Sequence, residues 1–351
     1  MPTAPVSPTP PATATLPSPR WWLWPQMLSL EAPAIAVLWM AALAHTHRLR
    51  LPPPFYWGLF LATWVVYLLD RLGDAEAAGE GAALTERHAF HWRHRRLLRW
   101  GLVPVILCAL LWAALWDIPE SLALQGLGLV LLGALYLASY STAAKSRQRM
   151  VLLGVGVGAG LLLLARLPVP SIYRLSAALA FSSAAFLAAR QGNDKRWRIV
   201  LPKELLASLL FVLGASAGVH FWSDGEHGWL CLETLLLWAI AALNMAGIAC
   251  AESLHGGPNA HGSIAQTHPQ IAGTLPILAM GLAAISGTVL VQSLAGRDTP
   301  YMAGTAAMVL ASSCLLLLLQ LSVQRLSPAT FRTLADFALL LPLPLVWWVG
   351  K

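Results

Sequence analysis

Residues 54–74 read PFYWGLFLATWVVYLLDRLGD, and the character of this stretch determines how the rest of the chain is interpreted. The segment is almost entirely apolar until it reaches Asp70 and Asp74. About twenty apolar residues are what an α-helix needs to cross the hydrocarbon core of a bilayer. We therefore expect 54–72 to be a membrane-spanning helix that carries acidic side chains at one end.

The composition of the whole chain also indicates an integral membrane protein. Of its 351 residues, 57% are hydrophobic and only 11% are charged, whereas a soluble domain carries about 25% charged residues. These values exclude a soluble enzyme, a nucleic-acid binder and a disordered protein. The net charge of +7 is typical of basic residues that mark the cytoplasmic side of a membrane. The four cysteines lie inside apolar runs, without the spacing of a disulfide framework or a zinc site.

Further segments share the length and apolarity of 54–72. They predict an all-α, polytopic membrane helix bundle with about eleven transmembrane helices. Residues 1–19 are predicted to form a disordered, Pro-rich cytoplasmic tail, and 20–351 a single transmembrane domain. The predicted spans are 21–44, 54–72, 97–116, 120–140, 149–166, 171–190, 203–222, 228–250, 270–294, 301–323 and 332–350.

The distribution of basic residues over these spans predicts the orientation of the chain. With eleven spans, 17 of the 23 Lys and Arg residues fall on the side of the N-terminus. Lys and Arg accumulate in the cytoplasmic loops of membrane proteins. We therefore expect a cytoplasmic N-terminus and a C-terminus on the outer side.

The few acidic residues gather at this cytoplasmic face. Asp70 and Asp74 are four residues apart and share one helix face with Tyr67. Two like charges at this spacing repel each other, and a divalent cation would turn that repulsion into a binding site. Hard oxygen ligands suit Mg²⁺, which often brings its own waters and a substrate phosphate. The alternative is a helix end that reaches water, with Arg71 offsetting the charge.

Other polar residues lie at the same face on other predicted helices. Lys203 and Glu204 begin one span, Asn244 and Glu252 lie two turns apart near the end of another, and Asp336 lies about one turn into the last. Lys203 is alternatively an ordinary anchor in the headgroup region, and Asn244 a bridge between helices. Ionisable residues within membrane segments are costly, and independent helix ends would scatter them over both faces. The pattern predicts one polar pocket that opens to the cytoplasm.

A basic segment follows the second span and contains His88, His91 and His94 at every third position. We interpret it as an interfacial segment that attracts anionic headgroups or a diphosphate. A metal site is the alternative for the three histidines.

At these residues the sequence resembles the UbiA superfamily of intramembrane prenyltransferases. The first match is the Asp70-x-x-x-Asp74 element at the end of a span, followed by a long basic cytoplasmic segment. A divergent bacterial UbiA-like branch is more similar still. The pieces that carry this likeness are Tyr67 to Asp74, Arg87 to His91, Pro202-Lys203-Glu204, Asn244 with Glu252, and Ala335-Asp336.

The resemblance implies a fold, a reaction and a location. The fold would be a core of nine spans with an extra hairpin, in a bacterial inner membrane. The reaction would be the Mg²⁺-dependent transfer of an isoprenyl group from an isoprenyl diphosphate to a lipid-soluble, aromatic acceptor. Asp70 and Asp74 would be catalytic and would hold the metal, with Glu252 as a further metal ligand. The implied diphosphate-binding residues are Tyr67, Arg71, Lys203, Asn244 and Glu252, and the second-tier candidates are Glu204, Asp336, His88 and His91.

The chain departs from the family pattern at both metal-binding motifs. The turns before Asp70 read Trp64-Val65-Val66, where the family has an Asn and another Asp. No second Asp-x-x-x-Asp pair follows; Glu252 with Asn244 is the substitute, and Glu204 competes with it. Fewer carboxylates weaken metal binding. The alternative function is therefore a non-catalytic relative that binds an isoprenoid, a pigment or a partner protein.

The predicted orientation is testable with reporter fusions. A reporter enzyme that is active only outside the cytoplasm should be active when it is fused after Lys351. The same reporter should be inactive when it is inserted in the basic segment between Arg87 and Arg96. The reverse pattern of activities would contradict the predicted topology.

Overall fold

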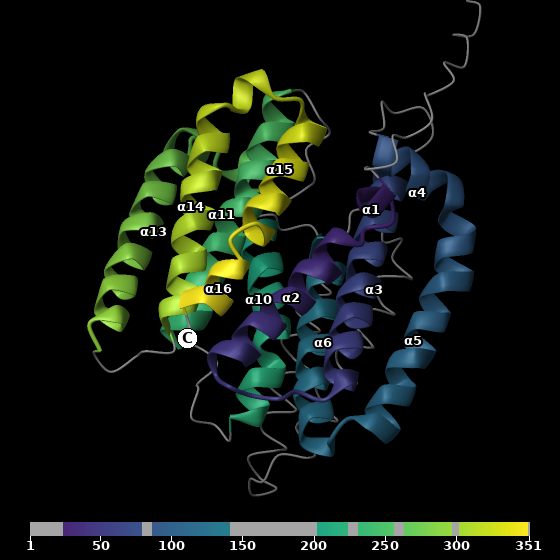
Figure 1. Ribbon diagram of the computed structural model, residues 1–351. Helices are drawn as coiled ribbons and strands as arrows, with labels where there is room; N and C mark the ends of the chain where they lie inside the picture. The colour runs from purple at the N-terminus through teal and green to yellow at the C-terminus, as the bar shows by residue number, and fades with distance from the viewer. Residues whose placement is uncertain are drawn as a thin grey trace, which may run out of the picture.

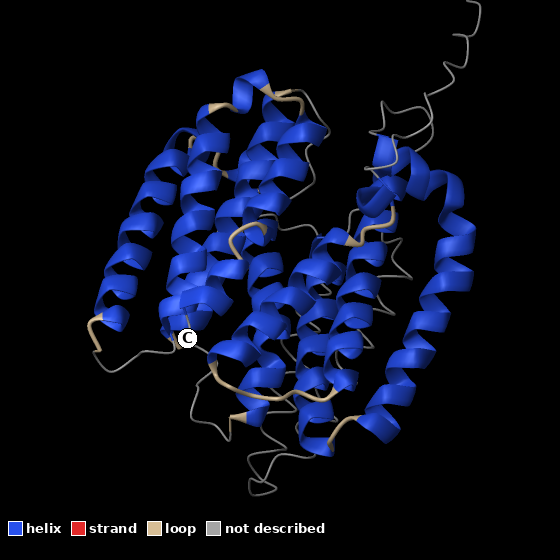
Figure 2. Cartoon of the chain, in the orientation of Figure 1, coloured by secondary structure: helices blue, strands red, loops and turns tan. Residues whose placement is uncertain are grey.

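The computed structural model describes residues 24–78, 86–140, 202–223, 231–255, 263–296 and 302–349. Within these ranges every regular element is a helix (Figure 2). The predicted tail 1–19 and the predicted spans 149–166 and 171–190 lie outside the described residues.

The helices follow one another along the chain as Figure 1 shows. In order they are α1 (Trp24–Met27), α2 (Glu31–Thr46), α3 (Pro53–Ala78), α4 (Glu86–Leu97), the π-helical turn η2 (Leu98–Leu102), α5 (Val103–Trp112), the π-helical turn η3 (Ala113–Asp117), α6 (Glu120–Tyr140), α10 (Lys203–Trp222), α11 (Leu232–Leu254), α12 (Ile264–Thr267), α13 (Ile271–Leu294), α14 (Met302–Leu321), the 3₁₀ turn η4 (Val323–Arg325), α15 (Pro328–Leu340) and α16 (Pro344–Val349).

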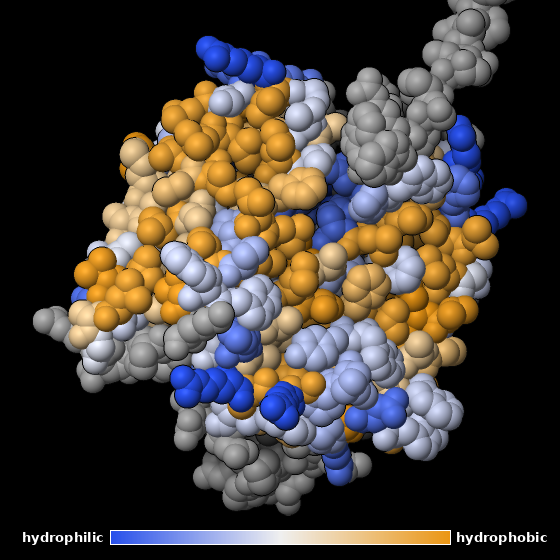
Figure 3. Space-filling view, in the orientation of Figure 1, coloured by the Kyte–Doolittle hydropathy of each residue, from blue (hydrophilic) through white to orange (hydrophobic). Residues whose placement is uncertain are grey.

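Helical segments that are long and apolar enough to cross a membrane confirm the predicted helical bundle. There are six among the described residues: Ala89–Asp117, Lys203–Trp222, Leu232–Leu254, Ile271–Leu294, Met302–Leu321 and Pro328–Val349. This number does not support the predicted count of about eleven spans. The apolar surface that the bundle presents in Figure 3 is compatible with an integral membrane protein.

The first predicted span is not one continuous helix. It is broken between α1 and α2, where Ser29 has a left-handed backbone with φ 55°. Pro33 explains the break, because a proline ring inside a helix clashes with the carbonyl of the residue four positions earlier, here Ser29. Since α2 begins at Glu31, Pro33 lies in its first turn. The N–H groups of the first turn have no partner within the helix, so the missing N–H of Pro33 costs no helical hydrogen bond.

The last predicted span is divided in the same way. α15 ends at Leu340 and α16 begins at Pro344. Pro342 and Pro344 have no N–H to continue the helix. The hydropathy of 332–350 is continuous across the break, which is why apolarity alone predicted one span.

The basic segment after α3 is helical from Glu86 onward. α4 continues through η2 into α5, so that Ala89–Asp117 forms one long helical segment. Its N-terminal part holds the arginines and histidines, and its C-terminal part exposes apolar side chains such as Val105, Leu111 and Trp116.

α10 lies at the centre of the bundle. It packs against α2, α6 and α11, and Figure 1 shows it between the α13–α14 side and the α3–α5 side. The core around it is apolar and contains Trp39, Val212, Ile240 and Val309, each at most 1% exposed. The positions of α3 and α11 relative to α10 decide where the polar side chains meet.

A buried polar cluster closes one end of this core. His47 Nε2 lies 2.6 Å from Glu233 Oε2, and the Thr305 hydroxyl donates to Glu233 Oε1 at 2.5 Å. These residues end α2, begin α11 and begin α14 respectively. Glu233 thus connects three helices.

Removing the Glu233 carboxylate should destabilise the bundle strongly. Glu233→Ala takes away the partner of both His47 and Thr305 inside the core. Breaking a buried pair by removing one member costs about 3–5 kcal/mol, so the thermal unfolding temperature of the detergent-solubilised protein should fall clearly. Asp117→Ala, which removes an exposed carboxylate, is the control. Equal unfolding temperatures for the two variants would contradict the role of Glu233.

Candidate functional site

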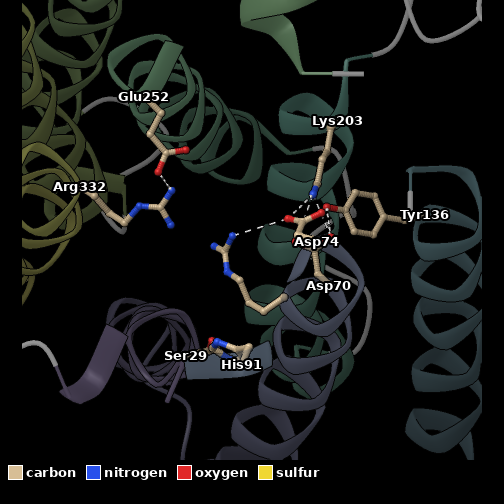
Figure 4. A network of polar contacts seen from close by, with 9 residues as sticks. Ser29, Asp70, Asp74, His91, Tyr136, Lys203, Glu252 and Arg332 are labelled. Atoms are coloured by element: carbon tan, nitrogen blue, oxygen red, sulfur yellow. Dashed lines mark hydrogen bonds and ion pairs between the residues drawn. The ribbon is translucent and has the colours of Figure 1, made fainter. Parts of the chain in front are cut away.

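The carboxylates of Asp70 and Asp74 share one ammonium group, that of Lys203 (Figure 4). Lys203 Nζ lies 3.0 Å from Asp70 Oδ1 and 3.5 Å from Asp74 Oδ2. The Tyr136 hydroxyl on α6 donates to Asp70 Oδ1 at 3.4 Å. The three charged side chains are only 12%, 15% and 18% exposed. Side chains from α3, α6 and α10 therefore meet around a single cation.

The local sequence explains how these groups come together. The four-residue spacing puts Asp70 and Asp74 on one face of α3, one turn apart. Pro202 is extended, with φ −60° and ψ 152°, and so starts α10 at Lys203. The first residue of α10 thus supplies the ammonium group that contacts both aspartates.

Arg71 connects this group with acids on other helices. Its Nη1 lies 4.0 Å from Asp74 Oδ2, and its side chain is 14% exposed. It also interacts electrostatically with Glu31 on α2 and Glu252 on α11. Its Nε is buried and has no hydrogen-bond partner within the described part of the chain. Arg71 thus has a donor that no described side chain uses.

A second polar group lies between α11 and α15. Arg332 and Glu252 form an ion pair, which Figure 4 shows across from the Lys203 group. Asn244 Nδ2 donates to Asp336 Oδ1 at 3.4 Å. The predicted residues Asn244 and Glu252 on α11 therefore both have partners on α15 at this end of the bundle.

Glu204, predicted as a competitor for the second motif, is held by different partners. Its buried carboxylate accepts a hydrogen bond from Ser263 Oγ at 2.6 Å and one from the Ile264 backbone N–H at 2.8 Å. Ser263 is the N-cap residue of α12. In the described arrangement Glu204 fastens α12 to α10, whereas Lys203 beside it contacts the aspartates.

The histidines of the basic segment do not reach the aspartates in the described contacts. His91 is completely buried, and its Nε2 lies 3.5 Å from the hydroxyl of Ser29 at the α1–α2 break. Figure 4 shows this pair apart from the Lys203 group. His88 lies on α4, but its side chain is outside the part that the structure describes.

The donor set of the site limits how it could hold a metal ion. No group of three or more His, Cys, Asp or Glu side chains suited to a metal occurs among the described residues. Mg²⁺, however, is commonly held by one or two carboxylates together with substrate phosphates and waters. Asp70 and Asp74 converge on one cation position, which the Lys203 ammonium fills here. The pair fits a Mg²⁺–diphosphate if Lys203 turns to the phosphate.

Two residues of this site were not predicted from the sequence. Arg332 lies one turn before Asp336 in a predicted span, and a basic residue within a span was a signal that could have identified it. Tyr136 lies in an apolar stretch that is typical of a lipid-facing or core helix. No sequence signal marks it, because its importance depends on the packing of α6 against α3 and α10.

Comparisons with known proteins were made for the whole chain. No family model matches it, and neither a curated protein nor a solved structure matches it. The chemistry that the site offers follows from its own side chains. Lys203, Arg71 and Arg332 are cations suited to phosphate oxygens, and the carboxylates beside them are suited to a hard cation.

The Lys203–Asp70 contact can be measured with a double-mutant cycle. Lys203→Met should lower the stability of the detergent-solubilised protein, because two mostly buried carboxylates lose their shared cation. Adding Asp70→Asn should restore part of the loss, with a coupling energy of about 1 kcal/mol or more. Additive effects of the two substitutions would show that the contact contributes nothing to stability.

Proposed function

We propose that the chain is a UbiA-like membrane prenyltransferase. It binds an isoprenyl diphosphate at the polar site between α3, α10, α11 and α15, and transfers the prenyl group to a lipid-soluble, aromatic acceptor. The observation that carries this proposal is the convergence of Asp70 and Asp74 on a single cation, Lys203, at one end of an apolar bundle. The polar end would bind the diphosphate, and the apolar helix surfaces would bind the prenyl chain.

In this proposal Asp70 and Asp74 would hold the Mg²⁺ that comes with the diphosphate, and that ion would contribute positive charge beside the departing diphosphate. Lys203 is a point charge on a flexible stem, so it can leave the carboxylates and bind a phosphate oxygen. Arg71 Nε, which has no partner in the described chain, is a second donor for the same anion.

The reaction requires charge stabilisation and exclusion of water. The allylic carbon–oxygen bond breaks with its electron pair going to the diphosphate. The acceptor then supplies the electron pair of the new bond and loses a proton. Lys203 and Arg71 would stabilise the negative charge that develops on the leaving group. Apolar side chains that pack around Tyr136, such as Leu137 at 5% exposed and its neighbours Leu69 and Leu206, would keep water from the allylic cation.

A second function is favoured by one specific observation. Lys203 neutralises Asp70 and Asp74, and Arg332 neutralises Glu252. The three predicted metal ligands are therefore already paired with cations of the protein. This pairing favours a non-catalytic protein that binds an isoprenoid, a pigment or a partner protein without a metal.

We also propose a membrane and an orientation for the protein. The polar site would open to the cytoplasm of a bacterium, with the protein in the inner membrane and its N-terminus inside. The basic residues of α4 support this orientation, since cytoplasmic segments are rich in Lys and Arg.

Binding and turnover of an isoprenyl diphosphate test the proposal. The purified protein should bind an allylic isoprenyl diphosphate more tightly with Mg²⁺ than with a chelator, and should release diphosphate when an acceptor is present. Asp70→Asn and Asp74→Asn should each reduce turnover by 100-fold or more, because removing one group that stabilises transition-state charge costs about 10²–10³ in rate.

Asp117→Asn, which changes an exposed aspartate outside this site, is the matched control and should retain full activity. Metal-independent binding without diphosphate release would favour the non-catalytic function. Binding that is absent with Mg²⁺ and with chelator would contradict the prenyltransferase, and would leave a pigment or a partner protein as the ligand of the non-catalytic function.

A further inference from the structure

Two arginines on the outer face of α4 are exposed and one helical turn apart. They are Arg93 and Arg96, and within the described chain neither forms an ion pair or a hydrogen bond. They lie on the opposite side of α4 from His91, which is completely buried. Their guanidinium groups therefore face away from the polar site between α3 and α11.

The neighbouring cations of this segment have partners of their own. The Arg95 guanidinium lies over the Trp92 ring, 3.9 Å from its centroid, and donates to the Trp92 carbonyl at 2.7 Å. Arg99 Nη1 lies 2.6 Å from Glu76 Oε1. Arg93 and Arg96 are thus the arginines of α4 and η2 that are described and still available for an external anion.

These two side chains border a shallow, open depression in the surface, called the recess below. It has a volume of about 350 Å³ and is formed by five consecutive residues of one helix, Arg93, His94, Arg95, Arg96 and Leu97. At its end and just beyond it the helix exposes two large apolar side chains, Leu97 at 68% and Trp100 at 78%. A cationic recess is therefore followed within about one turn by a surface that suits hydrocarbon.

The helix around the recess continues as a segment long enough to cross a bilayer, Ala89–Asp117. Tryptophan is enriched at the level of the lipid headgroups. With Trp100 at that level, the arginines would lie beside phospholipid phosphates, and the apolar side chains beyond them would lie where acyl chains begin.

We propose that this recess binds the phosphodiester headgroup of an anionic phospholipid from the surrounding leaflet. Arg93 and Arg96 contact the phosphate, and Leu97 and Trp100 contact the glycerol and upper acyl chain. The surplus of positive charge selects an anionic headgroup, because the ammonium of a zwitterionic lipid would meet further arginines. The bound lipid holds α4 at the membrane surface and thereby maintains the contact between His91 and Ser29.

The test is retention of lipid by the full-length protein in detergent, measured by native mass spectrometry after incubation with phosphatidylglycerol or phosphatidylcholine. The wild type should retain phosphatidylglycerol in preference to phosphatidylcholine. The variant Arg93→Gln/Arg96→Gln should bind phosphatidylglycerol about tenfold more weakly or worse, because two charge-assisted contacts are lost.

The matched control is Arg48→Gln/Arg50→Gln, which removes the same charge from two exposed arginines between α2 and α3. It should retain phosphatidylglycerol as the wild type does. Equal retention of the two lipids by the wild type, or equal losses in the two variants, would overturn the proposal. The proposal would also be overturned if an isoprenyl diphosphate displaced phosphatidylglycerol to the same extent from the wild type and from Arg93→Gln/Arg96→Gln. None of these outcomes depends on catalytic activity.

Discussion

The shared contact of Lys203 with Asp70 and Asp74 is the interaction on which the polar end of this bundle depends. An unpaired charge in an apolar environment is costly, so three such side chains at 12–18% exposure require one another. The contact also joins α3 to α10. Because α10 packs against α2, α6 and α11, this pairing lies where several helices meet.

The buried polar cluster of Glu233 with His47 and Thr305 lies at the other end of the core. The apolar side chains between the two ends, such as Trp39 and Ile240, are almost completely buried. Sliding one helix past another by a turn, about 5.4 Å, would separate partners at one end or the other. The two polar clusters therefore fix the register of helices whose apolar surfaces alone would pack in several ways.

Prolines shape the ends of this architecture. Pro33 and Pro342 interrupt stretches whose hydropathy is continuous, because a proline has no backbone N–H and its ring clashes with the preceding helical turn. Gln26 Nε2, in α1, donates to Thr333 Oγ1 on α15 at 2.6 Å. The short helix before the first break thereby contacts the helix that carries Arg332. A continuous first span would have placed Gln26 further along the axis of α2.

The sequence alone determined that the chain is a helical membrane bundle, because apolar runs of membrane length leave few other folds. It also determined that Asp70 and Asp74 share a helix face and that polar residues collect at one end, since helical spacing is a local property. Only the tertiary structure decided the partners: Lys203 for the aspartates, Arg332 for Glu252, and Ser263 for Glu204. Spacing along a chain defines which side chains lie on one face of a helix. Which helices lie next to each other depends on how all of them pack, and that is decided only when the whole bundle forms.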